Sequence, residues 1–267
     1  MITSTSNSQV KHVMKLKGKS RDRKEEGRFL VEGTKMYGEA PQGWIEKTYV
    51  SREFLEKPEA RCLRGREYEV VENHVFRAMS DTQTPQGILC IVKMPSYRLE
   101  DLLNRETPLL MILENIQDPG NLGTIIRTAE GAGVTGVVMG GGTVDIFNPK
   151  TIRSTMGSIY RVPFRYEEDL TGLVERLADS GITSYAAHLN GTFCYDEMDY
   201  RKGTAFLIGN EANGLSDQLA KAAGAYIRIP MAGEVESLNA AVASSILMYE
   251  ASRQRRQAPG RLGSKGC

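Results

Sequence analysis

Apolar residues recur along the chain with two different spacings, and the clearer pattern lies in the C-terminal half. Residues 109–113 form a continuous apolar run, as expected for a strand buried on both faces of a parallel sheet. Similar short apolar runs predict further strands at residues 134–139, 183–189, 204–209 and 225–230. Helical spacing separates these strands at residues 124–131, 150–154 and 170–180. The alternation predicts a doubly wound parallel sheet, in which ligands bind at the carboxyl ends of the strands.

The last predicted helix, residues 239–253, follows a loop that contains Gly233. Ser237 is the predicted N-cap, because a serine hydroxyl can accept a hydrogen bond from an unpaired backbone N–H. Small residues share this helix with larger apolar ones such as Val242, Ile246 and Tyr249. That is more apolar surface than one core-facing stripe requires, so we expect the helix to be buried on two sides.

The N-terminal part carries a shorter pattern of the same kind. Strands are predicted at residues 29–33, 45–51, 68–71 and 86–92. Helices are predicted at residues 1–25, 35–40 and 73–79. We therefore expect a small α/β domain at residues 1–95, a linker at 96–106 and a second domain at 107–267, with a basic C-terminal tail.

Composition narrows the class of protein. Of the 267 residues, 40% are hydrophobic and 25% charged, which is typical of a soluble globular chain. No run is long enough to span a membrane and no apolar leader precedes the first domain, so a cytoplasmic location is predicted. The four cysteines are far apart and only three histidines occur, so we expect neither a metal site nor a cysteine nucleophile.

The formal net charge is only +1, yet basic residues are concentrated at both ends. Residues 1–30 contain eight Lys or Arg against three acids, and residues 253–267 contain five against none. Such runs suit contacts with phosphate, although solvated surface helices and a frayed tail would look the same.

Polar side chains gather in three loops that should meet at the carboxyl edge of the predicted sheet. The segments that follow residues 113, 208 and 229 contain the candidate site residues Asn121, Arg127, Gly209, Asn210, Glu211, Ser237, Leu238 and Asn239. None of these loops has the Gly-x-Gly-x-x-Gly pattern of dinucleotide enzymes, and the glycine run at 140–142 lacks the third spaced glycine. A nucleotide-dependent dehydrogenase is therefore disfavoured.

The same three loops resemble the motifs of the SpoU/TrmH-type RNA 2′-O-ribose methyltransferases of the SPOUT superfamily. The motifs are Asn-Leu-Gly-Thr-Ile-Ile-Arg at 121–127, the segment 206–215 and the segment 229–243. The resemblance covers about residues 107–256, and residues 1–95 are similar to the ribosomal-protein-like substrate-binding domain often fused to this family. It implies a deep C-terminal trefoil knot, which the rarity of knotted chains would argue against.

The resemblance also implies a cofactor, S-adenosylmethionine, and a homodimer with its active site at the subunit interface. By matching motif positions, the cofactor pocket would be lined by Leu189, Gly209, Asn210, Ile229 and Leu238. The substrate would be RNA, with the domain arrangement favouring ribosomal over transfer RNA.

Arg127 is the residue that we expect to act most directly on the substrate. An arginine normally stays protonated, so its predicted role is to clamp a phosphate or stabilise the developing alkoxide. Asn121, Glu211, Ser237 and Asn239 are predicted to orient Arg127, the cofactor and the ribose. The alternative is a non-catalytic RNA-binding or ribosome-assembly factor that retains the fold.

Overall fold

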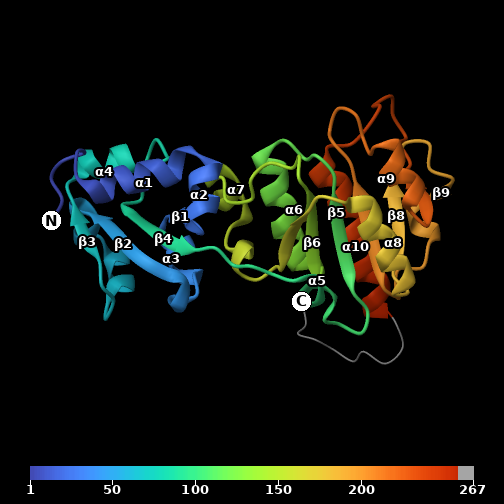
Figure 1. The fold of residues 1–267 in the computed structure, drawn as a ribbon, viewed down its shortest axis with the longest axis horizontal. Helices are drawn as coiled ribbons and strands as arrows, with labels where there is room; N and C mark the ends of the chain where they lie inside the picture. Colours follow the sequence, from blue (N-terminus) through green and yellow to red (C-terminus); the bar gives the residue numbers. More distant parts are fainter. Residues whose placement is uncertain (258–267) are drawn as a thin grey trace. The chain divides into compact units, whose positions relative to one another are not determined.

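The computed structural model describes residues 1–257 and divides into two compact units (Figure 1). The first unit consists of Met1–Pro95 together with Asp145–Tyr160, and the second of Ser96–Val144 with the chain from Arg161 onward. The segment 145–160, which sequence order alone placed in the second domain, is thus part of the first unit.

The first unit is built on a four-stranded sheet with the order β1-β4-β2-β3. The strands are β1 (Arg28–Glu32), β2 (Ile45–Ser51), β3 (Glu69–Val71) and β4 (Ile88–Lys93). β4 runs antiparallel to both β1 and β2, whereas β2 and β3 are parallel. The central strand β4 is buried at its first five residues, because it has a neighbour on each side and layers above and below.

Helices and short 3-10 turns cover this sheet. The elements are α1 (Ser8–Gly18), α2 (Ser20–Glu26), α3 (Thr34–Glu39), η1 (Gln42–Trp44), η2 (Arg52–Glu56), η3 (Pro58–Leu63) and α4 (Asn73–Met79). The single helix predicted for residues 1–25 is wrong, because Lys19 is extended (φ −128°, ψ 129°) and divides it into α1 and α2. Val10, Val13 and Leu16 fix α1 on the core of the unit.

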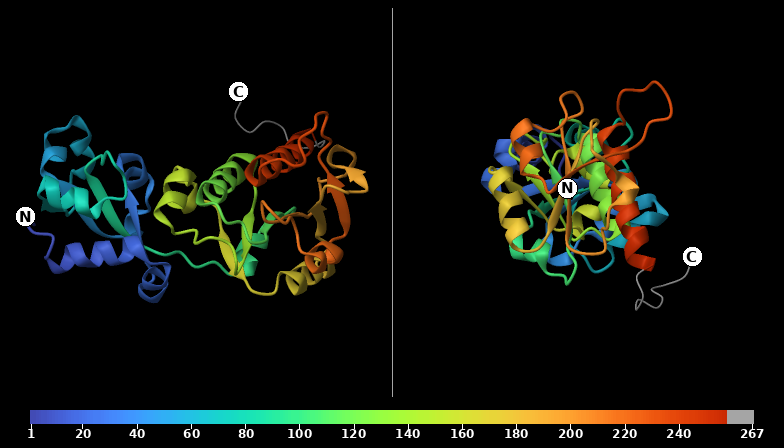
Figure 2. Two further views of the ribbon diagram at one scale, coloured as in Figure 1. Left: turned by 90° about the horizontal axis from the view of Figure 1, so that it is seen from above. Right: turned by 90° about the vertical axis from the view of Figure 1, so that its right-hand side faces the viewer.

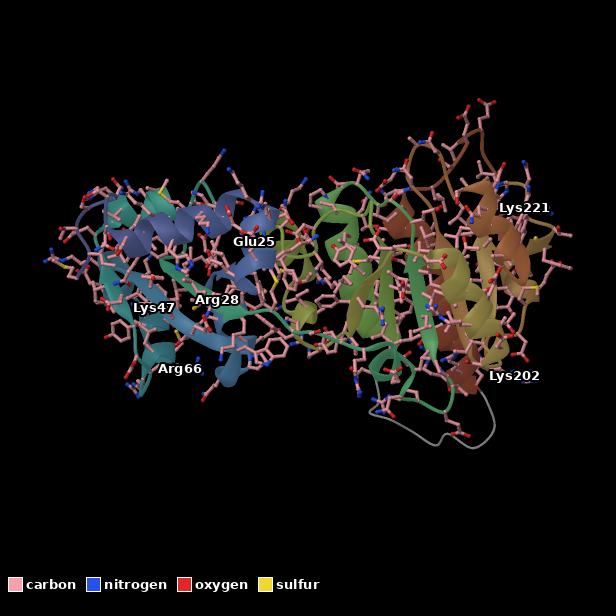
Figure 3. The ribbon with its side chains drawn as sticks, viewed as in Figure 1. Glu25, Arg28, Lys47, Arg66, Lys202 and Lys221 are labelled. Atoms are coloured by element: carbon pink, nitrogen blue, oxygen red, sulfur yellow. The ribbon has the colours of Figure 1, made fainter. Side chains whose placement is uncertain are left out.

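The basic character of this N-terminal segment is largely balanced within the unit. Lys15 pairs with Glu26 (2.8 Å) and Arg21 with Glu25 (2.7 Å). Arg28, labelled in Figure 3 beside the sheet, pairs with Glu46. The counts of charge along the sequence therefore overstate how much positive potential this face presents.

The inserted segment 145–160 contains α7 (Pro149–Thr155) and η4 (Ser158–Tyr160). Its ion pair with α2 is buried: Arg23 Nη2 lies 2.5 Å from Asp145 Oδ2, and the two side chains are 4% and 9% exposed. Phe147 packs on Phe29 with ring centroids 4.8 Å apart, and the Tyr160 hydroxyl donates to the Met36 carbonyl (3.1 Å). The first unit therefore needs this segment to complete its core.

The second unit contains a seven-stranded sheet with the order β7-β6-β5-β10-β8-β11-β9, in which every pair is parallel. The strands are β5 (Leu109–Leu113), β6 (Gly136–Gly140), β7 (Phe164–Glu167), β8 (Thr183–Ala187), β9 (Phe193–Cys194), β10 (Thr204–Ile208) and β11 (Ala225–Arg228). The predicted parallel α/β fold is confirmed, and β5, β6 and β10 are buried along their whole length as continuous apolar runs require.

Helices cover both faces of this sheet (Figure 2). The helices are α5 (Leu99–Leu103), α6 (Pro119–Ala132), α8 (Leu170–Asp179), α9 (Asp217–Ala222) and α10 (Ala240–Gln257), with η5 (Tyr195–Glu197) between strands. α5, α8 and α9 share one apolar cluster with the sheet, and α10 packs along α6 on the opposite face. The trefoil knot stays a prediction from the resemblance, with which this topology is consistent.

Candidate active site

A cleft of about 310 Å³ lies at the carboxyl ends of β8, β10 and β11. These strands are neighbours, with β8 in the middle, so their following loops meet at one edge of the sheet. The lining includes seven of the residues singled out from the sequence: Leu189, Gly209, Asn210, Glu211, Ile229, Ser237 and Leu238. Asn121, Arg127 and Asn239 do not line it.

The walls of the cleft combine apolar side chains with a turn that contains two glycines. Leu189, Ile229, Met231 and Leu238 supply apolar side chains, and residues 209–215 of the turn after β10 complete the lining. A flat heterocycle fits such a slot, because its faces need apolar contact and its edges need a few hydrogen bonds. The residues present therefore suit the adenosine part of S-adenosylmethionine.

Gly209 is required by close packing rather than by an unusual φ angle. A Cβ at this position would lie 2.0 Å from the carbonyl carbon of Gly214 and 2.1 Å from the nitrogen of Leu215. Asn210 and Gly214 pair through both backbone hydrogen bonds (3.0 and 2.9 Å), which folds the turn tightly back on Gly209. The absence of a side chain at 209 thus shapes one wall of the cleft.

Beside the cleft, three side chains form a directed hydrogen-bond chain. Asn239 Oδ1 accepts from the N–H groups of Ala241 (2.9 Å) and Val242 (3.3 Å), so its amide nitrogen is left to donate. Asn239 Nδ2 donates to Asn121 Oδ1 (3.0 Å), and Asn121 Nδ2 donates to Glu211 Oε1 (2.8 Å). One residue from each of the three loops is held in a single orientation, because the helix end and the carboxylate fix the two ends of the chain.

This arrangement corrects the predicted cap of the last helix. The side chain that caps α10 is Asn239, whose Oδ1 serves the second and third N–H groups of the helix. Ser237 lies in the preceding loop, exposed, on the lining of the cleft. Its hydroxyl is therefore available to a ligand and does not serve the helix.

The loop after β5 is tied to the loop after β10 by further contacts. Asn210 Nδ2 donates to the Asn115 carbonyl (2.8 Å), where Asn115 adopts a left-handed φ of 57°. The Glu114 carboxylate accepts from the Ser216 N–H and hydroxyl, both at 2.7 Å. The two loops are therefore rigid relative to each other.

The glycine run at 140–142 serves this same packing. A Cβ on Gly142 would lie 2.0 Å from Asn115 Oδ1, and the Gly142 carbonyl accepts from Gln117 Nε2 (2.8 Å). These residues do not line the cleft. Their role in the structure is to let the loop after β6 approach the loop after β5.

Arg127 lies on α6, whose start was predicted too late in the chain. The helix begins at Pro119 rather than Thr124, because Asp118 caps it by accepting from the Asn121 N–H (2.8 Å). Arg127 is exposed and forms no hydrogen bond or ion pair with another residue in the range 1–257. Its guanidinium is free to meet a ligand from outside the subunit.

His188 is a lining residue that the sequence did not single out. Its Nδ1 accepts from the Asn190 N–H (3.1 Å), and its ring stacks on Tyr226 with centroids 5.7 Å apart. This contact orders the loop that also carries Leu189. The available signal was a histidine directly at the carboxyl end of a predicted strand, which is the edge where ligands bind.

Residues 1–257 contain three cysteines, of which Cys90 is buried and Cys62 and Cys194 are half-buried. No group of three or more His, Cys, Asp or Glu side chains there is arranged to hold a metal ion. Burial raises the pKa of the Cys90 thiol to about 12, so this sulfur stays protonated and unreactive. Also within this range, no helix is long and apolar enough to cross a membrane.

Comparisons with known proteins match both parts of the chain to family models. The model of the SpoU rRNA Methylase family matches residues 108–249, and the model of the MRM3-like substrate binding domain matches residues 7–90. The 23S rRNA (guanosine(2553)-2′-O)-methyltransferase of Bacillus subtilis is 34% identical over 252 residues, which cover 93% of this chain and 97% of the relative.

Two solved structures are similar over nearly the whole chain. One is an AdoMet-bound rRNA methyltransferase from Sinorhizobium meliloti, with a TM-score of 0.82 and 34% identity, covering 94% of this chain and 97% of that one. The other is AviRb from Streptomyces viridochromogenes in complex with AdoMet, with a TM-score of 0.83 and 30% identity, covering 93% and 99%.

Proposed function

This chain belongs to the SpoU rRNA methylase family, and we propose that it methylates a ribose 2′-hydroxyl of ribosomal RNA. It is an RNA 2′-O-ribose methyltransferase that uses S-adenosylmethionine. The observation that carries the proposal is that the second and third motif loops line one cleft and that a hydrogen-bond chain through Asn121 joins the first motif loop to both.

The cleft after β8, β10 and β11 is where we place the cofactor. Leu189, Ile229 and Leu238 would hold its base, while the backbone at Gly209 and Asn210 would bind its polar edges. The bound cofactor supplies an activated methyl group on its sulfonium. Because the donor is already activated, the protein's main task is to position the ribose hydroxyl in line with that methyl.

Arg127 is proposed to hold the substrate rather than the cofactor. It lies outside the cofactor cleft and is unpaired within residues 1–257. Its planar guanidinium is therefore available to bind a phosphate or to stabilise the charge that develops on the ribose oxygen. Asn121, Glu211 and Asn239 would keep the neighbouring loops in place, and Ser237 would contact the ligand directly.

The experiment measures transfer of tritiated methyl from S-adenosylmethionine to 23S ribosomal RNA. Arg127→Ala is expected to lower the rate at least about 100-fold, as for loss of one charge-stabilising donor. Cofactor affinity by calorimetry should stay within a few-fold of the wild type. Arg127→Lys should restore little activity, since a point charge does not reproduce a planar fork. Binding of RNA with no methyl incorporation by the wild type would instead favour the assembly-factor alternative.

A homodimer is proposed as the working unit. Val242 and Tyr249 on α10 are each 48% exposed, which leaves apolar surface beside α6 that the subunit does not cover. A two-fold contact between these helices would bury it and would bring Arg127 of one subunit toward the cleft of the other. The exposed, unpaired state of Arg127 within residues 1–257 supports this arrangement.

The first unit is proposed to bind the RNA substrate, in keeping with the match of residues 7–90 to a substrate-binding domain. Ribosomal RNA is proposed as the substrate in preference to transfer RNA, because the relatives that are similar over more than 90% of this chain include two named for 23S rRNA.

A cytoplasmic location remains a prediction. Arg261 and Lys265 of the basic tail lie outside the described residues.

A further inference from the structure

A second cleft, of about 390 Å³, lies wholly within the first unit. It is bounded by the end of β2, the helix α4 and the loop 80–87 between α4 and β4. The side chains that matter here are Ser51, Lys57, Asn73, Arg77, Gln83 and Thr84, and we call the site the Arg77 cleft.

The loop 80–87 that forms one wall is fixed at both ends. At its start, the Glu32 carboxylate accepts from the hydroxyls of Ser80 and Thr82, both at 2.7 Å. At its end, Gln86 Oε1 accepts from the N–H (2.9 Å) and hydroxyl (3.2 Å) of Thr34. The loop therefore holds its shape before any ligand arrives, which reduces the entropy lost on binding.

The floor of the cleft is equally constrained. Gly87 has a φ of +98°, and a Cβ there would lie 2.6 Å from Ser51 Oγ and 2.9 Å from Phe54 Cβ. Ser51 Oγ is occupied as acceptor from the Phe54 N–H (3.2 Å), so its own proton remains available as a donor.

The polar groups around the rim are only partly used by the protein. Arg77 is exposed and has no hydrogen-bond or ion-pair partner within the described chain. Asn73 Oδ1 accepts from the Glu53 N–H (3.1 Å), which leaves its amide nitrogen as a donor. Lys57 forms an ion pair with Glu53 (3.7 Å), which also lines the cleft. The exposed side chains of Gln83 and Thr84 stand between these groups and solvent.

We propose that the Arg77 cleft binds one unpaired nucleotide of the RNA substrate. Arg77 and Lys57 hold the phosphate, while Asn73, Gln83 and Thr84 contact the edge of the base. The volume lies in the range of about 300–1,000 Å³ for small-molecule sites, which suits one nucleotide and not a duplex. Unpaired nucleotides are also the part of an RNA whose base edges a protein can read. The inference rests on the proposed function, because it assumes an RNA substrate.

The test measures binding of the full chain to a 23S rRNA transcript and to a short single-stranded oligoribonucleotide over a range of salt concentrations. Arg77→Ala should weaken both interactions about tenfold. The slope of log affinity against log salt should become shallower by about 0.7 for each phosphate that the protein no longer neutralises. Gln83→Ala should change the preference among oligonucleotides of different base and leave the salt dependence unaltered. A duplex competitor should not displace the oligonucleotide.

Arg64→Ala is the matched control, because Arg64 is an exposed arginine of the same unit that does not line the cleft. Thermal unfolding should show all three variants folded, since these side chains are exposed. If the wild type methylates 23S rRNA while Arg77→Ala binds as tightly as Arg64→Ala, the cleft assignment is overturned and the proposed function stands. Arg77-dependent RNA binding without methyl transfer would leave the cleft assigned and remove the proposed function.

Discussion

Asn239 serves two partners with one amide group. Its oxygen satisfies the first turn of α10, and its nitrogen continues to Asn121 and, through it, to Glu211. An amide is suited to this position because it carries an acceptor and a donor on the same planar group.

Substitution at Asn239 should separate these two roles. Asn239→Ala removes both and should lower the free energy of unfolding by about 0.5–2 kcal/mol through loss of the cap. Asn239→Asp keeps an acceptor for the helix but presents a carboxylate to Asn121 Oδ1, so Asn121 would have to turn its own oxygen toward Glu211. We expect near-native thermal stability with strongly reduced methyl transfer for Asn239→Asp. Equal activity of Asn239→Asp and the wild type would show that the hydrogen-bond chain is dispensable.

At the level of elements, the proposed cofactor cleft is lined by the loops that follow β8, β10 and β11. The turn after β10 can close on itself only because Gly209 carries no side chain. The loop before α10, by contrast, contains Gly233, where an added Cβ meets nothing within 4 Å. These two glycines are therefore under very different constraints.

This difference gives a matched pair of variants. Gly209→Ala should weaken cofactor binding more than about tenfold, a change of about 1.4 kcal/mol, since the backbone at Gly214 must move. Gly233→Ala should bind the cofactor normally and change stability by no more than about 0.5 kcal/mol. Calorimetry with S-adenosylmethionine compares the two, and similar affinities for both would contradict the close-packing argument.

Across the whole molecule, residues distant in sequence complete each unit. The segment 145–160 leaves the second unit after Val144 and contributes Asp145, Phe147 and α7 to the first. Deleting residues 1–95 would strip this segment of its packing partners, so such a fragment is a poor test of RNA binding. Substitutions in the full chain are preferable.

The Arg23–Asp145 pair should contribute strongly to folding of the first unit. Asp145→Ala leaves the nearly buried Arg23 guanidinium without its carboxylate, and loss of about 3–5 kcal/mol of unfolding free energy is expected. Glu25→Ala, in the exposed pair with Arg21, is the control and should leave unfolding unchanged. Figure 3 labels Glu25 on α2. Denaturant unfolding that gives the same result for both variants would argue against a structural role of the inserted segment.

The proposed shared active site can be tested by subunit exchange. Arg127→Ala and Asn239→Ala are each expected to be inactive, and Asn239 bonds to Asn121 of its own chain. If Arg127 acts on the partner's cleft, each heterodimer of the two variants contains one site with both lesions and one with none. Activity should then return toward half per heterodimer. Exchange proven by mass without recovered activity would place both residues in one site of one chain.

Much of this architecture follows from local patterns. Continuous apolar runs predicted β5 and β10, because a strand that is buried on both faces of a parallel sheet has apolar side chains on both sides. Topology alone placed eight loop residues at one sheet edge, and five of them, Gly209, Asn210, Glu211, Ser237 and Leu238, line one cleft in the structure. The start of α6 at Asp118–Pro119 also has a local signature, a capping carboxylate followed directly by proline.

Other features depend on contacts that no local pattern records. Ser237 and Asn239 are both good capping residues by type. In the structure Asn239 caps α10, and its amide also donates to Asn121. Likewise, the apolar residues of segment 145–160 predict that it is buried. They do not identify the unit against which it packs, because an apolar side chain can be buried against any other. The sequence by itself determined the helices and strands and the edge of the sheet at which the polar loops lie. Packing between distant segments decided which residue caps α10 and which unit α7 completes.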